Sequence, residues 1–264
     1  MRFRTILPRW NQAHSLRPSI SGATPNRIVK MIRINNLKKV YRSNNVETTA
    51  IANANLRVDF GEFVAITGPS GSGKTTLLSI LGMLDTATEG EYFLFDTDVS
   101  KYSERERADL RRENIGFVFQ NFNLINELTV YENIELPLFY LGLTSSERRE
   151  IVMSTMDRLR ITPRRNHFPQ QLSGGQQQRA AVARAIVGKQ KLILADEPTG
   201  NLDSRNGEEV MTLLAQLNEA GTTIIMVTHS AEYASWAGRL VRIFDGHLVN
   251  EDILTGVPGV LELR

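Results

Sequence analysis

The fold is decided by the stretch Ile66-Thr67-Gly68-Pro69-Ser70-Gly71-Ser72-Gly73-Lys74-Thr75-Thr76-Leu77-Leu78. It fits the pattern G-x-x-x-x-G-K-[ST], which is typical of a loop that surrounds phosphate groups. The apolar run from Phe63 to Ile66 predicts a buried strand before the loop, and Thr76 to Leu84 predicts a helix after it. A glycine-rich turn before an ordinary helix is the alternative, but strand, loop and helix stand in the order that the pattern requires.

The residues of this loop suit a nucleotide and a magnesium ion. Glycines let the backbone turn its N–H groups toward phosphate oxygens, and the helix N-terminus adds partial positive charge. We expect Lys74 to reach the β- and γ-phosphates and the Thr75 hydroxyl to hold Mg²⁺. The candidate nucleotide-binding residues of the loop are Gly68, Pro69, Ser70, Gly71, Ser72, Gly73, Lys74, Thr75 and Thr76. The loop alone names no function, because kinases, GTPases and motors share it.

Composition excludes several other classes. The chain has 264 residues, of which 41% are apolar and 23% charged, as in ordinary globular proteins. No apolar run approaches the length of a membrane span, and without cysteine there are no disulfides, cysteine-ligated zinc sites or thiol catalysis. Residues 1–30 hold six of the 31 Lys and Arg residues and no acid, which leaves 25 basic and 29 acidic residues elsewhere. This slightly acidic remainder argues against a large nucleic-acid face, so we expect no direct nucleic-acid partner.

Residues 1–30 are expected to lie outside the folded domain. They show neither helical nor strand periodicity, contain three prolines, and lack the apolar segment of a secretory signal. Their basic, acid-free composition is similar to that of a transit peptide, and a true start at Met31 is another alternative. We interpret the segment as a disordered or spurious extension.

The segment after Met31 favours strands at Met31 to Leu37 and at Ala50 to Val58. Tyr41 follows the first of them. An aromatic residue here can stack on an adenine ring or form a half-buried sheet edge, and this residue alone favours the edge.

Polar side chains follow two further predicted strands. Gln120 ends the apolar run Ile115 to Phe119, and His229 ends Thr222 to Thr228. Open α/β sheets bind ligands at the carboxyl ends of their strands, so both residues are candidates for the same site. A single histidine is more often structural, but its place at this edge makes the two interpretations comparable for His229.

Two carboxylates follow the buried strand Leu192 to Ala195. Successive residues of a strand point to opposite sides, so Asp196 and Glu197 cannot have the same role. We expect Asp196 to support Mg²⁺ and Glu197 to act as general base toward a water molecule. Asp203 follows in a turn before a helix from Ser204 to Ala220.

Residues 121–180 interrupt the alternation of strands and helices. Thr129 to Leu141 predicts a helix with an internal proline, and Thr144 with Glu147 forms a capping box that begins the next helix. We therefore predict an inserted helical subdomain. The stretch between Gln120 and about Leu141 carries Phe122, Leu124, Ile125 and Leu128 close together, more apolar residues than a solvated loop needs, so we expect this surface to bind a partner.

The segment Leu172-Ser173-Gly174-Gly175-Gln176 predicts a helix N-terminus with unusual features. Ser173 and Gln176 have capping-box spacing, and the two glycines leave free N–H groups that an anion can approach. Glycine in a helix costs roughly 1 kcal/mol against alanine, so a plain helix start does not explain the pair, and we favour a binding role. Further on, Asp245-Gly246 predicts the hairpin turn that closes the domain near residue 252 and leaves a tail at 253–264.

Taken together, these residues resemble an ABC-type ATPase over Met31 to about Asp252. The resemblance implies a P-loop NTPase (RecA-like) α/β core, an antiparallel β subdomain and an inserted helical subdomain. It also implies that Tyr41 stacks on adenine, that the loop from Gly68 to Thr75 holds the phosphates of ATP, and that Gln120 contacts Mg²⁺ and the attacking water.

The remaining motifs match the family in the same order. Leu172 to Gln176 is an unaltered signature, LSGGQ, which implies that Ser173, Gly174, Gly175 and Gln176 bind ATP. Asp196 and Glu197 match the metal-supporting aspartate and the catalytic glutamate. Asp203 matches the D-loop, and His229 matches the histidine that contacts the γ-phosphate. No catalytic position is degenerate, so we expect an active ATPase.

The resemblance implies a homodimer in which each ATP lies between the phosphate loop of one subunit and the LSGGQ helix of the other. Asn121 to Leu138 and Ala195 to Asp203 are similar to the lipoprotein-release and macrolide-export branch, whose ATPases bind membrane permease subunits. We therefore expect a peripheral protein on the cytoplasmic face of the membrane. A soluble ABC ATPase acting on DNA or ribosomes is the alternative, but neither heptads nor cysteines nor a second phosphate loop are present.

Overall fold

The computed structural model describes residues 30–43 and 46–253. The predicted extension lies outside this range except for Lys30, whose ammonium forms a 2.6 Å ion pair with Asp59. The predicted tail lies outside it from residue 254 onward.

A single ten-stranded sheet runs through the described residues in the order β5-β4-β1-β2-β10-β9-β3-β8-β7-β6. One end is antiparallel and comprises β1 (Ile32–Ser43), β2 (Val46–Val58), β4 (Glu89–Leu94) and β5 (Thr97–Asp98). The other end is parallel and comprises β9 (Arg239–Phe244), β3 (Phe63–Thr67), β8 (Thr223–Val227), β7 (Leu192–Asp196) and β6 (Ile115–Phe119). Strand β10 (His247–Ile253) pairs with β9 and joins the two ends.

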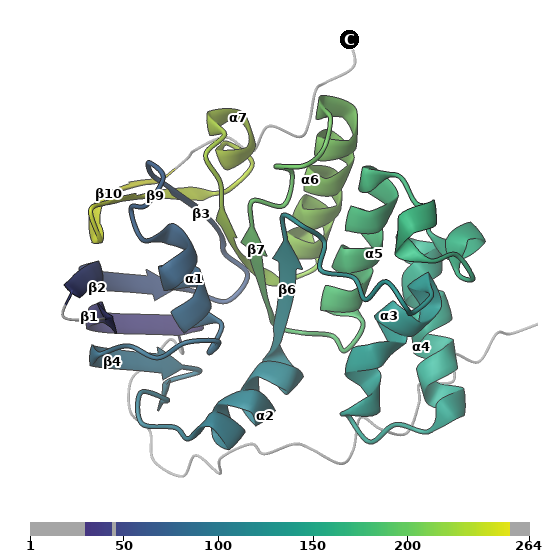
Figure 1. The fold of residues 1–264 in the computed structure, drawn as a ribbon, viewed down its shortest axis with the longest axis horizontal. Coiled ribbons are helices and arrows are strands. Elements are labelled where there is room, and N and C mark those ends of the chain that lie inside the picture. Colours follow the sequence, from purple (N-terminus) through teal and green to yellow (C-terminus); the bar gives the residue numbers. More distant parts are fainter. Residues whose placement is uncertain (1–29, 44–45, 254–264) are drawn as a thin grey trace, which may run out of the picture.

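Helices cover both faces of the parallel strands. Helix α1 lies beside the antiparallel strands, whereas α3, α4, α5 and α6 gather on the opposite side of the molecule (Figure 1). Their bounds are α1 (Lys74–Leu81), α2 (Glu104–Asn114), α3 (Val130–Phe139), α4 (Ser145–Arg158), α5 (Gly174–Ile186), α6 (Ser204–Glu219) and α7 (Ala231–Ala234). Two 3₁₀ turns, η2 (Thr162–Arg164) and η3 (Pro169–Gln171), connect α4 to α5.

Two hydrophobic cores cover the parallel strands, one on each face. In β7, Leu192 and Leu194 join the core beneath α1, while Ile193 and Ala195 join the core under α3 to α6. Side chains alternate along a strand, so a strand buried on both faces must be apolar throughout. This explains the continuous apolar runs that precede the candidate site residues.

Two helix caps and one hairpin turn that the sequence predicts are confirmed by the structure. Both predicted capping boxes form, at Thr144 and at Ser173, and each side chain accepts a bond from the backbone N–H three residues on. Asp245 and Gly246 have φ angles of 44° and 74°, as a type I′ hairpin requires. Helix α1 begins at Lys74, two residues earlier than predicted, because Gly73 takes a left-handed conformation at the N-cap. Lys74 and Thr75 therefore lie in the first helical turn.

Candidate active site

A cavity of about 440 Å³ opens where the phosphate loop meets the carboxyl ends of β7 and β8. It brings together the loop and three of the polar residues predicted at the sheet edge. Its lining residues are Thr48, Thr49, Ala50, Gly68, Ser70, Gly71, Gly73, Lys74, Thr75, Thr76, Asp196, Glu197, Val227 and His229. Sequence reasoning did not include Thr48, Thr49 and Ala50, which reach the cavity from β2.

The loop is fixed by close contact with neighbouring strands. A Cβ atom on Gly68 would lie 2.2 Å from the carbonyl oxygen of Ile243, and one on Gly73 would lie 2.3 Å from that of Ala50. Gly73 also has a φ of 103°, which disfavours other residues. The loop conformation is therefore built into the packing of the domain before any ligand arrives.

Lys74 lies over this loop. Its ammonium donates to the carbonyl oxygens of Gly68 at 2.9 Å and Pro69 at 2.8 Å. The Ser72 side chain is 2% exposed, and its hydroxyl has no hydrogen-bond partner among the described residues. Positive charge and an unpartnered buried hydroxyl in a curled loop suit an anionic ligand such as a nucleotide phosphate.

Thr75 and Asp196 face each other across the cavity. The Thr75 hydroxyl donates to an Asp196 oxygen at 3.5 Å. Burial raises the pKa of Asp196, and the neighbouring Glu197 adds to the effect, although the Thr75 hydrogen bond and the charge of Lys74 oppose it. Within residues 30–43 and 46–253, no group of three or more His, Cys, Asp or Glu could hold a metal alone. One carboxylate and one hydroxyl fit Mg²⁺, which commonly takes its other ligands from phosphates and water.

Glu197 and His229 form a pair at the cavity wall. A Glu197 oxygen lies 2.9 Å from Nδ1 of His229 and accepts a 3.3 Å bond from the backbone N–H of the same residue. The Glu197 side chain is 16% exposed, and that of His229 is 71% exposed. Glu197 also has a φ of 47°, an uncommon angle for this residue type. The carboxylate is thus held in one orientation at the edge of the cavity, where it can accept a proton from water.

Gln120 does not line this cavity. Its side-chain amide donates to Asn201 at 3.1 Å, and the Asn201 amide donates to the Gln120 carbonyl at 3.1 Å and to Asn121 at 2.8 Å. The contact of Gln120 with Mg²⁺ and water stays a prediction. Asn201, which the sequence analysis did not single out, connects the segment after β6 to the segment after β7.

The LSGGQ residues also lie away from the cavity lining of their own chain. Ser173 caps α5 and Gln176 completes the capping box. Asp203 caps α6 by accepting a 2.8 Å bond from the backbone N–H of Asn206, a contact that lowers its pKa. The structure therefore separates the signature helix from the phosphate loop of the same subunit.

Tyr41 lies in β1 and is 43% exposed. Its hydroxyl donates to Asp85 at 2.8 Å, and the Lys39 ammonium lies 4.8 Å from the ring centroid. Lys39 also forms a 2.6 Å ion pair with Asp85. The ring is fixed but is not part of the cavity lining, so stacking on adenine remains a prediction for Tyr41.

Comparison with known proteins gives matches along most of the chain. A family model described as ABC transporter matches residues 51–200. An uncharacterized ABC transporter ATP-binding protein of Methanocaldococcus jannaschii is 48% identical over 219 residues, which are 83% of this chain and 98% of the relative. The macrolide export ATP-binding/permease protein MacB of Brucella melitensis is 45% identical over 221 residues, which are 84% of this chain. The match covers 34% of MacB, so this chain spans about a third of that protein's length.

Solved structures agree with these matches. A dimeric post-hydrolysis structure of the ATP-binding cassette MJ0796, bound to ADP and Pi, has a TM-score of 0.80 at 43% identity and covers 86% of this chain and 100% of that chain. The cbiO1 protein of Clostridium perfringens, part of the ABC transporter complex cbiONQ, has a TM-score of 0.77 at 26% identity and covers 86% of this chain and 89% of that chain. The predicted α/β fold class is thereby confirmed.

Proposed function

Because the chain belongs to the ABC transporter family and is the ATP-binding and ATP-hydrolysing subunit of such a transporter, we propose that two copies close head to tail around ATP and drive a membrane permease. The observation that carries the proposal is the position of the signature helix. Its capped N-terminus, at the start of α5, lies outside the cavity of its own chain. A two-fold dimer gives each such helix end a phosphate to bind and forms two equivalent sites.

Within each site, the residues that line the cavity have different roles. Lys74 and the loop N–H groups bind the phosphates, and Glu197, oriented by His229, accepts a proton from the water that attacks the γ-phosphate. The products are ADP and phosphate. We assign Thr75 and Asp196 as the residues that would hold Mg²⁺. When bound, this ion would neutralise part of the charge on the phosphates.

The substitution Glu197→Gln tests this assignment. The amide has nearly the shape of the carboxylate but cannot accept a proton, so we expect ATP binding to persist while turnover falls about 100-fold or more. The trapped ATP should hold a dimer that gel filtration detects. A Glu197→Gln variant that hydrolyses ATP near the wild-type rate would show that Glu197 is not the base.

For the permease, we propose a groove of about 530 Å³ whose lining includes Pro137 and Tyr140 of the predicted docking segment but not Phe122, Leu124, Ile125 or Leu128. Phe117 and Phe119 stack in its wall with ring centroids 5.6 Å apart, and Tyr140 and Leu84 are 63% and 49% exposed. Its lining residues are Leu84, Ala108, Asp109, Arg111, Arg112, Ile115, Gly116, Phe117, Phe119, Pro137, Tyr140, Arg184, Ala185 and Gln190. An apolar floor with a charged rim suits a short helix of a membrane partner.

The substitutions Tyr140→Glu and Leu84→Glu test the groove. We expect both to abolish co-purification of a membrane protein from solubilised membranes while basal ATP hydrolysis stays within about twofold, because neither residue lines the ATP cavity. Phe244→Glu is the matched control, since Phe244 is 55% exposed but lies on β9, outside the groove. Recovery of ribosomes or DNA, in place of a membrane protein, would favour the alternative class of soluble ABC ATPase.

We also propose that the protein works as a peripheral subunit on the cytoplasmic face of a membrane, because the permease would anchor it there. None of the described helices has the length and apolar character needed to cross a bilayer. The cargo would be selected by the permease.

A further inference from the structure

A glutamine of the signature helix reaches the part of the chain that carries Glu197. Gln178 lies on α5, beyond the cap at Ser173, and its side chain is fully buried. Its amide donates to the carbonyl oxygen of Pro198, the residue directly after Glu197. The same amide donates to the carbonyl oxygen of Phe119, at the end of β6, at 3.4 Å. One side chain therefore connects the signature helix with the carboxyl ends of two neighbouring strands.

The surroundings of Gln178 favour an apolar side chain. The next buried residues of the helix are Ala180, Ala181 and Val182. The Gln178 amide oxygen is buried and has no hydrogen-bond partner among the described residues. A buried polar atom without a partner costs free energy that an apolar side chain of similar shape would not. A glutamine at this position therefore indicates a role besides packing.

The backbone at Glu197 depends on its neighbours for its conformation. Its φ of 47° lies in a sparsely populated region, which persists only where the surrounding structure holds it. The Glu197 N–H donates to the carbonyl oxygen of Val227 at 2.9 Å, and its own carbonyl oxygen accepts from the N–H of Gly200 at 3.0 Å. The bond from Gln178 to Pro198 adds a contact from α5, so it links this conformation to the signature helix.

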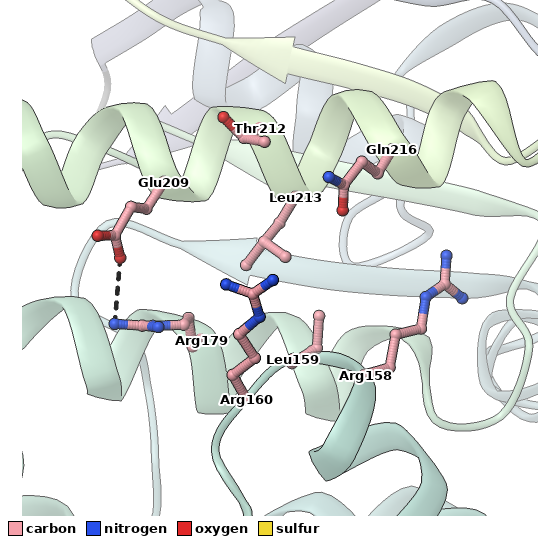
Figure 2. A pocket seen from close by; sticks show the side chains of 8 residues that line it. All are labelled: Arg158, Leu159, Arg160, Arg179, Glu209, Thr212, Leu213 and Gln216. Carbon is pink, nitrogen blue, oxygen red and sulfur yellow. Dashed lines mark ion pairs between the residues drawn. The ribbon is translucent and has the colours of Figure 1, made fainter.

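Helix α5 packs closely on the sheet and on α6. A Cβ atom on Gly116 of β6 would lie 2.0 Å from the carbonyl oxygen of Ala185, so the backbones of helix and strand touch near the C-terminal end of α5. Gln178 makes the contact nearer the N-terminal end. Arg179 forms a 3.1 Å ion pair with Glu209 of α6 instead (Figure 2). A displacement of α5 would therefore reach the strand ends through Gln178 and α6 through Arg179.

We propose that Gln178 is a positioning residue for ATP hydrolysis, which holds Glu197 in place relative to the signature helix; this inference rests on the proposed role of Glu197 as base. Gln178 touches neither the nucleotide nor the attacking water, and it acts through the backbone of Pro198. A displacement of about 1 Å in a catalytic group can lower the rate about 100-fold. The loss of one buried bond beside Glu197 should thus be visible in turnover.

The substitution Gln178→Met tests the proposal in the whole protein, because methionine is unbranched and flexible like glutamine but has no N–H donor. We expect kcat for ATP hydrolysis to fall about tenfold or more while KM stays within about twofold, since Lys74 and the phosphate loop are unchanged. Gln178→Leu should give the same result. Glu209→Ala is the matched control: it removes the ion pair between α5 and α6 (Figure 2) and should leave kcat within about twofold. Thermal unfolding checks the fold of each variant.

The double variant Gln178→Met/Glu197→Gln separates this inference from the role of Glu197 itself. If Gln178 acts through Glu197, adding Gln178→Met should change the residual single-turnover rate of Glu197→Gln by less than about twofold.

Several results would overturn the proposal. These are an unchanged kcat in Gln178→Met, a loss that appears in KM alone, an equal loss in Glu209→Ala, or the same tenfold loss in both the wild-type and the Glu197→Gln background. Failure of both Gln178 variants to fold would make the residue structural. Hydrolysis near the wild-type rate by Glu197→Gln alone would instead reject the base, and the role of Gln178 with it.

Discussion

The two glycines of the signature helix should respond in opposite ways to alanine. A Cβ atom on Gly174 would have its nearest neighbour at 3.3 Å, a methyl group of Leu202, which leaves nearly enough room. A Cβ atom on Gly175 would lie 2.0 Å from Oδ1 of Asn206 and 3.0 Å from its Cβ. Asn206 cannot move away freely, because its side-chain amide donates to Asp203 at 2.8 Å. Gly175 is therefore required by the packing of α5 on α6.

The magnitudes follow from two opposing effects. Alanine improves helix propensity over glycine by up to about 1 kcal/mol. At Gly174 little opposes this gain, so Gly174→Ala should leave the free energy of unfolding unchanged or raise it by up to about 1 kcal/mol. At Gly175, overpacking of a tight contact costs about 1–3 kcal/mol, so once the propensity gain is subtracted the net effect of Gly175→Ala should be a loss of up to about 2 kcal/mol.

Urea unfolding at 25 °C without nucleotide measures both variants, since ATP would add its own stabilisation to the folded state. Equal slopes of the free energy against urea concentration are the internal control that the unfolding transition itself is unchanged. If Gly175→Ala proves as stable as Gly174→Ala, the packing argument is wrong, and the second glycine must be explained by ligand binding alone.

Two further predictions concern stability away from the cavity. Asp85→Asn should cost about 1 kcal/mol at pH 7, because Asp85 binds Lys39 and Tyr41. Burial would raise the pKa of Asp85, but the hydrogen bonds from Lys39, Tyr41 and the Thr86 backbone outweigh it and lower this pKa below 3.8. The difference in unfolding free energy should therefore persist above pH 3.8 and shrink below it; a pH-independent difference would contradict the ionic origin. Asn133→Leu should lower the free energy of unfolding by about 2–4 kcal/mol, because the buried Asn133 amide forms hydrogen bonds with four backbone groups between residues 125 and 129. Urea unfolding measures this loss, and a loss under about 1 kcal/mol would contradict the reasoning.

Features set by neighbouring residues were predictable from the sequence. The strand before the loop, the caps at Thr144 and Ser173, and the turn at Asp245 each depend on a few consecutive residues, and all are confirmed. The position of the cavity at the carboxyl edge of the sheet was also predictable from the sequence, because parallel strands end together and place Asp196 near Thr75.

Features set by contacts between distant segments were not predictable. Thr48 to Ala50 reach the cavity only because β2 pairs with β1 and β10, and nothing in their own sequence indicates a ligand. The bond between Gln120 and Asn201 joins residues far apart in the chain. Gly175 was interpreted from its own cost in a helix, whereas the structure supplies a second reason in Asn206.

The proposal that ATP binds between two subunits makes a sharper prediction than any single substitution. Lys74→Ala removes the charge that we propose binds the phosphates, and Ser173→Arg removes the cap of α5 and blocks its N-terminus. Each homodimer should be inactive. In a mixed dimer, both lesions can fall in the same composite site, because one chain supplies the broken loop and the other the broken signature helix.

The second site of that mixed dimer then has an intact loop and an intact signature. ATPase activity should therefore return when the two inactive proteins are mixed, rise to a maximum near equal amounts, and vanish again with either protein alone. Mixing each inactive protein with buffer in place of its partner is the control. If the signature served the nucleotide of its own chain, every subunit would carry one lesion in its only site. The mixing curve would then be flat, and the head-to-tail arrangement would have to be abandoned.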